Sequence, residues 1–284
     1  MVFLPLILSF ASIFPIGQVE KAIKAERGNN AETSIFGFDI HPYPYQSEIL
    51  EKLEAEREVN RHYRNLVVAA TGTGKTVISA FDYKHFFSKN KGKPCRLLFI
   101  AHREEILKQS MLCFRAILKD ANFGELYVGS YIPESIDHLF ISIQTFNSKE
   151  FYKYTTREFY DYIVVDEFHH AAAPTYQILL DYYQPKILLG LTATPERMDG
   201  KSIIEYFDNR IAAEIRLPEA IDRKLLCPFH YFGVTDNVDL RLTGLSDEKA
   251  RESAKRKLID GDIRFIFVVD LYNEGVDIPD NPVS

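Results

Sequence analysis

The sequence has 284 residues, of which 46% are hydrophobic, and its 34 basic and 40 acidic side chains give a net charge of −6. This length and composition are typical of a folded protein with one large domain or two smaller ones, and they exclude a disordered chain. Because the chain is mildly acidic, any binding to nucleic acid must come from a local basic patch rather than from the overall field.

The N-terminal stretch 1–18, MVFLPLILSFASIFPIGQ, is apolar and uncharged. A secretory signal has positive residues before its apolar run, and this stretch has none. Pro5 and Pro15 would interrupt a membrane-spanning helix. It can be a non-native leader from an upstream start, a weak membrane anchor, or a strand and loop packed on the folded body. We favour the leader and expect no membrane partner. With the polar linker that follows, it makes up residues 1–35, and the body begins near Phe36.

Five short apolar runs alternate with charged stretches between about 62 and 195. The runs are NLVVAA (65–70), RLLFIA (96–101), HLFISI (138–143), YIVVDE (162–167) and KILLGLTAT (186–194). They do not alternate with polar residues, which is typical of strands buried on both faces, and stretches such as 103–120 have helical spacing. The pattern predicts an α/β fold with a parallel sheet flanked by helices, whose ligands bind at the carboxyl ends of the strands.

The first run leads into the glycine-containing stretch ATGTGKT (70–76). Its candidate nucleotide-binding residues are Thr71, Gly72, Thr73, Gly74, Lys75 and Thr76. The two glycines allow backbone N–H groups to surround phosphates, and a helix that begins near Lys75 adds a favourable dipole. Lys75 is expected to reach the β- and γ-phosphates, and the Thr76 hydroxyl to hold Mg²⁺. Ala69 stands where the strict motif has glycine, so the alternative is a plain turn before a helix.

An acidic pair, Asp166 and Glu167, closes the fourth apolar run. Asp166 is expected to hold Mg²⁺ through its water shell, and Glu167 to orient and deprotonate an attacking water. An acidic pair after a strand often only starts a loop. This pair lies 91 residues after Lys75 (166 − 75) in the same predicted sheet, and we therefore expect both stretches to form one nucleotide site.

Taken together, the motifs resemble those of superfamily 2 helicases of the DExH kind. ATGTGKT, DEFH (166–169) and LTATP (191–195) resemble motifs I, II and III, and PYPYQSEIL (42–50) resembles the Q motif. FIAHREEIL (99–107) and ISIQTF (141–146) resemble motifs Ia and Ic, and VVDLYNEGVDIP (268–279) resembles motif V of a second RecA-like lobe. The similarity covers roughly residues 38–280 and extends to bacterial DEAD/DEAH-box proteins akin to the helicase subunits of type I and type III restriction enzymes.

The resemblance implies an ATP hydrolase of the helicase or translocase type, with ATP and Mg²⁺ as cofactors. It implies that Gln46 hydrogen-bonds the adenine edge and that Gly275 and Asp277 complete the nucleotide site. It also implies that His169, as the fourth letter of the DExH box, couples the γ-phosphate site to motif III. The alternative for His169 is a polar helix start, and a metal role is disfavoured because no further ligands occur at suitable spacing.

The resemblance also implies a nucleic-acid partner. The residues expected to grip its backbone are Ala101, His102, Arg103, Gln144 and Thr145, and those expected to transmit the nucleotide state are Thr192 and Thr194. DNA is favoured over RNA because the helicases that these motifs resemble include restriction-type translocases, and a nuclease domain or subunit is a further candidate partner. Three widely separated cysteines without a CxxC pair disfavour zinc and disulfides and suit a cytoplasmic location.

The motif order predicts two lobes of unequal completeness. Residues 36–228 are expected to form the first RecA-like lobe and residues 229–284 an incomplete second lobe. Motif IV is missing near 240–245, and the sequence stops before motif VI, whose arginine finger contributes about 10³–10⁵-fold to turnover. We therefore expect impaired hydrolysis, and the alternative is a non-motor fragment that binds nucleotide or nucleic acid without efficient turnover. A small-molecule kinase is disfavoured, because the DExH box and TATP have no role there.

Overall fold

The computed structural model describes residues 39–129, 131–170, 174–195 and 203–227, and it divides the chain into two compact units. Phe10–Leu226 forms one unit, which contains every described helix and strand. The other unit comprises Met1–Ser9 and Cys227–Ser284. The expected leader and linker and the expected second lobe lie outside the described residues. Among the helices that the structure describes, none is long and apolar enough to cross a membrane.

Most of the described strands are separated by helices along the chain, although β4 follows β3 directly. The strands are β1 (Arg64–Ala69), β2 (Leu97–Ala101), β3 (Glu125–Tyr127), β4 (His138–Ser142), β5 (Tyr162–Val165), β6 (Ile187–Thr192) and β7 (Ala213–Ile215). The α-helices are α3 (Pro44–Glu58), α4 (Lys75–Lys89), α5 (Glu104–Leu118), α6 (Ile143–Ser148), α7 (Pro174–Tyr182) and α8 (Leu217–Asp222). The 3₁₀ helices are η2 (Phe151–Tyr154), η3 (Phe168–His170) and η4 (Ile204–Phe207).

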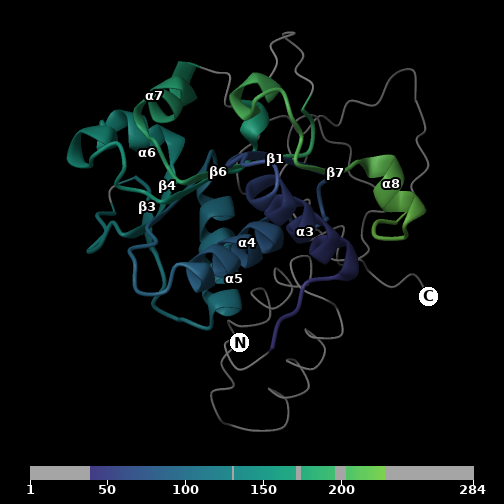
Figure 1. Cartoon of the computed structure of the whole chain (residues 1–284). Helices are drawn as coiled ribbons and strands as arrows, with labels where there is room; N and C mark the ends of the chain where they lie inside the picture. The colour runs from purple at the N-terminus through teal and green to yellow at the C-terminus, as the bar shows by residue number, and fades with distance from the viewer. Residues whose placement is uncertain (1–38, 130, 171–173, 196–202, 228–284) are drawn as a thin grey trace, which may run out of the picture. The chain divides into compact units, whose positions relative to one another are not determined.

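The seven described strands form one parallel sheet in the order β3-β4-β2-β5-β6-β1-β7 (Figure 1). The register pairs Val165 with Gly190 and Val68 with Thr192, so β6 separates β5 from β1 by the width of one strand. All five apolar runs become strands, and the predicted parallel α/β fold is confirmed. The two remaining strands, β3 and β7, are short edge strands that the sequence pattern did not indicate.

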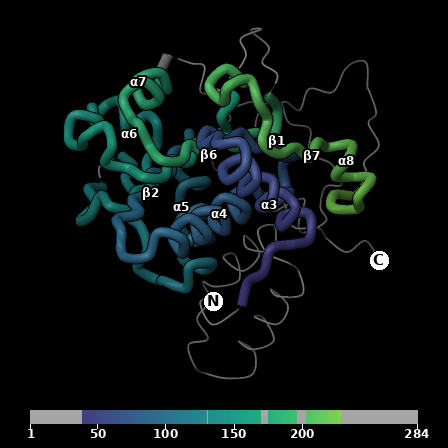
Figure 2. Tube along the Cα trace, viewed as in Figure 1, coloured from purple at the N-terminus to yellow at the C-terminus, as the bar shows by residue number. Residues whose placement is uncertain are grey.

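Helices cover both faces of the sheet, which explains why its strands are apolar on both sides. α3, α4 and α5 lie on one face, and α6 and α7 lie on the other (Figures 1 and 2). On the first face the ring of Phe114 lies 5.9 Å from that of Tyr83 and 5.7 Å from that of Phe99. On the second face the rings of Phe168 and Phe207 lie 4.6 Å apart. Many of the aromatic residues are therefore core residues rather than a base-stacking surface.

Gly190 in β6 allows two aromatic rings to approach the sheet closely. A Cβ at this position would lie 2.4 Å from Phe207 Cζ and 2.9 Å from Phe168 Cδ2, which is closer than non-bonded carbon atoms approach. The glycine therefore lets η3 and η4 pack directly on β6. Because Phe168 directly follows the acidic pair, this contact also fixes the chain as it leaves Glu167.

A buried ion pair joins the C-terminal half of α3 to the middle of α4. Arg57 donates from both Nη atoms to the two carboxylate oxygens of Asp82 at 2.7 Å, and from Nε to Asn65 at 2.7 Å. Tyr162 also donates to Asp82. Burial opposes the charge on Arg57, but Asp82 outweighs burial and raises the pKa of the guanidinium. Since α4 begins at Lys75, this pair holds the two helices that enter the predicted nucleotide site.

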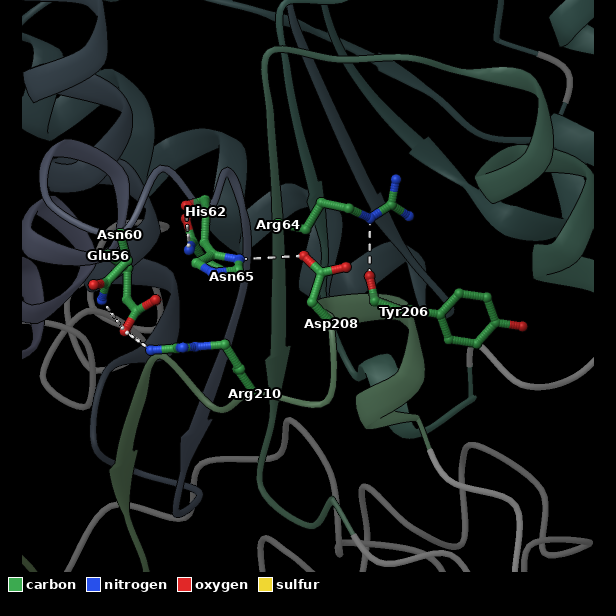
Figure 3. A network of polar contacts seen from close by, with 8 residues as sticks. All are labelled: Glu56, Asn60, His62, Arg64, Asn65, Tyr206, Asp208 and Arg210. Atoms are coloured by element: carbon green, nitrogen blue, oxygen red, sulfur yellow. Dashed lines mark hydrogen bonds and ion pairs between the residues drawn. The ribbon is translucent and has the colours of Figure 1, made fainter.

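A second polar network lies at the amino end of β1 (Figure 3). His62 Nδ1 lies 3.3 Å from Asp208 Oδ2, and Arg64 Nε donates to the Tyr206 carbonyl at 2.9 Å. Arg210 lies 3.0 Å from the carboxylate of Glu56. These contacts fasten the turn between η4 and β7 to the connection between α3 and β1. β7 is thereby aligned beside β1.

Candidate nucleotide and nucleic-acid site

The residues predicted to act on a nucleotide follow three neighbouring strands, β5, β6 and β1. The phosphate loop follows β1, the acidic pair follows β5, and the TATP stretch continues from the end of β6. Because all three strands are parallel, their carboxyl ends lie at one edge of the sheet. The fold therefore brings the three motifs together.

The phosphate loop has the backbone conformation that its glycines permit. Gly72 has φ 86° and Gly74 has φ 75°, both in the left-handed region that side chains disfavour. The Thr73 amide and hydroxyl both donate to the Ala70 carbonyl, at 3.2 and 2.7 Å. Lys75 opens α4, and its Nζ donates to the carbonyl of Ala69 at 3.1 Å. The loop thus presents backbone amides at a helix N-terminus, an arrangement suited to phosphate.

Gln46 braces this loop from α3. Its Nε2 donates to the Thr73 carbonyl at 3.2 Å, and its Oε1 accepts from the Tyr43 amide at 2.9 Å. A Cβ on Gly74 would lie 2.6 Å from Gln46 Nε2, so the second glycine is needed for this approach. The side chain is only 2% exposed and both ends of its amide are engaged with protein. Its predicted contact with adenine remains a prediction.

Tyr45 is a site residue that the sequence analysis did not single out. Its hydroxyl donates to the same Thr73 carbonyl at 2.9 Å. Burial raises the pKa of Tyr45 to about 12, so the hydroxyl keeps its proton and remains a donor. The signal available from sequence was its place beside Gln46 in the Q-motif stretch.

The acidic pair lies at the carboxyl end of β5 with little exposure, 5% for Asp166 and 8% for Glu167. The Asp166 amide donates to the Ile100 carbonyl, which extends the pairing with β2, and the Glu167 amide donates to Asp166 Oδ1 at 2.9 Å. Glu167 has φ 52°, a left-handed conformation that costs a non-glycine residue about 1–3 kcal/mol and that clusters at functional sites. The strained turn directs the chain away from the strand immediately after the two carboxylates.

A hydrogen-bonded chain links the acidic motif to the stretch after β6. His169 Nδ1 lies 3.3 Å from Thr192 Oγ1. Thr192 Oγ1 donates to the Thr194 carbonyl at 2.9 Å and accepts from the Thr194 amide at 3.2 Å. Because the single hydroxyl proton of Thr192 is directed to Thr194, His169 acts as the donor from Nδ1. The three residues predicted to couple the nucleotide site to the rest of the protein are therefore in contact.

The oxygen donors of the site fit magnesium. Thr76 supplies a hydroxyl at the start of α4 and Asp166 supplies a carboxylate at the end of β5. Mg²⁺ in nucleotide enzymes takes one or two such protein oxygens and completes its shell with phosphates and waters. Within the described parts of the chain, no group of three or more His, Cys, Asp or Glu residues forms an all-protein metal cage. The donor set thus suits an ion that arrives with a phosphate ligand.

The residues predicted to touch nucleic acid follow the neighbouring strands β2 and β4 at the same edge. His102 and Gln144 are exposed, and Gln144 Nε2 lies 2.9 Å from His102 Nδ1. Arg103 is half-buried at the N-cap position of α5. The fold therefore places three polar side chains on two adjacent strand ends, beside the acidic pair on β5.

Two of the predicted nucleic-acid residues are buried. Ala101 is the last residue of β2 and has no exposed surface. The hydroxyl of Thr145 accepts from Ser142 Oγ at 2.8 Å and from the Gly129 amide at 3.3 Å. Thr145 therefore links the turn at Gly129 to the start of α6, and its hydroxyl is engaged within the fold. Gly275 and Asp277, the remaining predicted site residues, lie outside the described part of the chain.

Comparison with known proteins identifies the family of the chain. The family model described as type III restriction enzyme, res subunit, matches residues 39–197, more than half of the chain. The chain belongs to this family. It is 29% identical over 232 residues to an Escherichia coli protein, the type I restriction enzyme EcoAI endonuclease subunit. That match covers 77% of this chain but 27% of the subunit, so the chain spans about a quarter of its length.

Solved structures show the same fold. The helicase domain of Pyrococcus furiosus Hef has a TM-score of 0.52 at 20% identity, over 78% of this chain and 45% of that chain. A nuclease-deletion mutant of the type ISP restriction-modification enzyme LlaGI, solved with a DNA substrate mimic, has a TM-score of 0.50 at 20% identity. That match covers 64% of this chain and 18% of the enzyme. The predicted RecA-like fold and the predicted resemblance to restriction-enzyme helicases are confirmed.

Proposed function

We propose that this chain carries the first ATP-binding lobe of a nucleic-acid-dependent ATPase of the superfamily 2 type, which uses hydrolysis to move along DNA. The observation that carries the proposal is the meeting of three motifs on β5, β6 and β1, two of which are joined through His169 and Thr192. A plain glycine turn before a helix would need neither the buried acidic pair nor this link. The family to which the chain belongs points to the same activity.

In this proposal each residue of the site has a distinct role. Lys75 leaves the Ala69 carbonyl to contact the β- and γ-phosphates, and the loop amides surround them. Thr76 and Asp166 hold magnesium, which neutralises charge on the phosphates. Glu167 orients the attacking water and accepts its proton, and the strained backbone keeps its carboxylate at the strand end. His169 and Thr192 transmit the state of the γ-phosphate to Thr194.

The proposed track is DNA, and it crosses the ends of β2 and β4. Arg103 and the exposed pair His102 and Gln144 supply side-chain contacts, while Ala101 and Thr145 contribute through backbone or as supports. DNA is favoured because one relative is a restriction endonuclease subunit and one structural neighbour was solved with a DNA substrate mimic. A nuclease domain or subunit is the matching partner. The three free cysteines agree with our assignment to the cytoplasm.

The test is steady-state ATP hydrolysis with and without single-stranded DNA, double-stranded DNA and RNA. Lys75→Ala removes the phosphate-binding amine, and Lys108→Ala is a matched control because Lys108 is an exposed residue of α5 that pairs with Glu104. We expect DNA-stimulated hydrolysis in the wild type and in the control, and its loss in Lys75→Ala. Stimulation by RNA alone would refute the choice of track. Nucleotide binding without turnover above Lys75→Ala would support the alternative, a binding fragment without a motor.

A further inference from the structure

The last part of the described unit packs against the phosphate loop. A Cβ built on Gly72 would lie 3.0 Å from Leu226 Cδ2. Chain neighbours aside, no other heavy atom of the described residues comes within 4 Å of that position. Leu226 lies 154 residues after Gly72 (226 − 72) and belongs to none of the helicase-like motifs. Its half-buried side chain is therefore a contact to the loop that the sequence did not indicate.

The local structure places Leu226 there. β7 pairs with β1, and the Ala70 amide, at the start of the phosphate loop, donates to the Ile215 carbonyl at 3.0 Å. After α8, Lys224 adopts φ 57° and reverses the chain. The amides of Leu225 and Leu226 both donate to the Ala220 carbonyl, at 2.8 and 3.2 Å. The turn thus directs the chain back towards the phosphate loop, which follows β1.

An ion pair connects the same segment to α3. Arg223 Nη1 lies 2.9 Å from Glu48 Oε2, and Glu48 is two residues after Gln46. Both side chains are about half exposed, so solvent screens this pair and its attraction is weak. The ion pair mainly fixes position, because it holds the segment against α3, the helix whose first turn contacts Thr73. The segment 213–226 therefore contacts both elements that shape the loop.

We propose that Leu226 is a positioning residue of the nucleotide site, which supports Gly72 in the left-handed conformation of the loop. The inference deepens the proposed function and rests on it. Gly72 has no side chain with which to anchor itself, so the contact restricts a residue that is otherwise free to change conformation. By linkage, a nucleotide that prefers the supported loop also holds Leu226 against Gly72, and by the same factor. Nucleotide occupancy thereby also restricts Cys227, the residue that follows Leu226.

The first measurement is the affinity for MgADP by fluorescence titration with a methylanthraniloyl-labelled nucleotide. Leu226→Ala removes the contact, Leu226→Met retains most of it, and Leu217→Ala removes a 42% exposed leucine of α8 as a matched control. We expect Leu226→Ala to weaken binding about five-fold, the lower end of typical coupling between sites. Leu226→Met and Leu217→Ala should bind like the wild type. Urea unfolding of each variant confirms that it is folded before its affinity is compared.

The second measurement uses Cys227 as a built-in probe. It is exposed, whereas Cys95 and Cys113, the other cysteines, are buried, and burial raises the pKa of both thiols. We expect MgADP to slow the reaction of Cys227 with a thiol-reactive dye in the wild type, but not in Leu226→Ala at saturating nucleotide. Mass spectrometry identifies the labelled cysteine.

The outcomes separate the inference from the proposed function. If wild type and Leu226→Ala bind MgADP equally and Cys227 reacts at the same rate with and without nucleotide, Leu226 has no positioning role and only this inference fails. If the folded wild-type chain binds no MgADP, the proposed function fails and the inference fails with it. If Leu226→Ala binds MgADP more weakly than the wild type and Leu226→Met binds it just as weakly, the packing argument is also overturned.

Discussion

Replacing Asp82 by Asn tests whether the buried ion pair holds α3 and α4 together. The substitution keeps the shape of the side chain but leaves the charge of Arg57 without its counter-ion. Arg57 is 8% exposed and Asp82 is 3% exposed, so water cannot replace the lost interaction. Removing one partner of such a pair costs about 3–5 kcal/mol, a large part of the roughly 5–15 kcal/mol that stabilises a typical domain.

The matched control is Lys89→Ala, which breaks an ion pair with Glu54 between the same two helices. Both of those side chains are 51% exposed, so we expect a loss of at most about 1 kcal/mol. The assay is urea unfolding followed by far-ultraviolet circular dichroism. With a slope of about 2–3 kcal/mol per M, the loss of about 3–5 kcal/mol should lower the midpoint for Asp82→Asn by about 1–2.5 M.

The double variant Arg57→Met/Asp82→Leu sharpens this test. Replacing a buried pair by apolar residues of similar size is often neutral or stabilising, so it should recover part of the stability that Asp82→Asn loses, less the cost of removing the partners of Tyr162 and Asn65. A midpoint for Asp82→Asn that matches the Lys89→Ala control would refute the reasoning. It would mean that the pair contributes no more than an exposed one.

Three further predictions concern the core, the coupling chain and pH. Gly190→Ala should destabilise the protein by about 1–3 kcal/mol, measured as a lower melting temperature, because the added methyl overlaps Phe207; an unchanged value would contradict the close packing. His169→Ala and Thr192→Val should each lower DNA-stimulated ATP turnover while MgADP affinity stays within about two-fold, since the contact between them links the acidic motif to the stretch after β6; equal losses in affinity would refute a coupling role. Burial raises the pKa of Tyr45 to about 12 in the folded protein. The contribution of its protonated hydroxyl to the free energy of unfolding is therefore complete below pH 10 and is lost between pH 10 and 12. Urea midpoints should fall over that range, and less steeply in Tyr45→Phe.

The five long strands were predictable because each is a run of apolar residues that the sheet buries on both faces. β3 and β7 were not predictable. Each has three residues, ELY in β3 and AEI in β7, and neither is a run of apolar residues. They exist because β4 and β1 offer them a parallel edge, which is a tertiary effect. The observed bounds of the predicted strands differ from the apolar runs by two residues at most.

Some features of the candidate site were also predictable from the sequence, and others were not. The phosphate loop and the acidic pair follow strands directly, so the carboxyl-edge rule was sufficient to bring them together. The brace by Tyr45 and the contact of Leu226 with Gly72 depend on packing between residues 28 and 154 positions apart, and no periodicity reports such contacts. Thr145 was expected to meet nucleic acid, but its hydroxyl is used inside the fold.

The most direct test of the account is the binding of MgATPγS measured by titration calorimetry. The wild type and Lys108→Ala should bind with the same affinity, and Lys75→Ala should bind at least about ten-fold more weakly, because a charge-assisted hydrogen bond to phosphate contributes about 1.5–3 kcal/mol. Asp166→Asn should reduce the gain in affinity that magnesium provides. Equal binding by wild type and Lys75→Ala, or no dependence on magnesium in either, would contradict the assignment of this sheet edge as a nucleotide site.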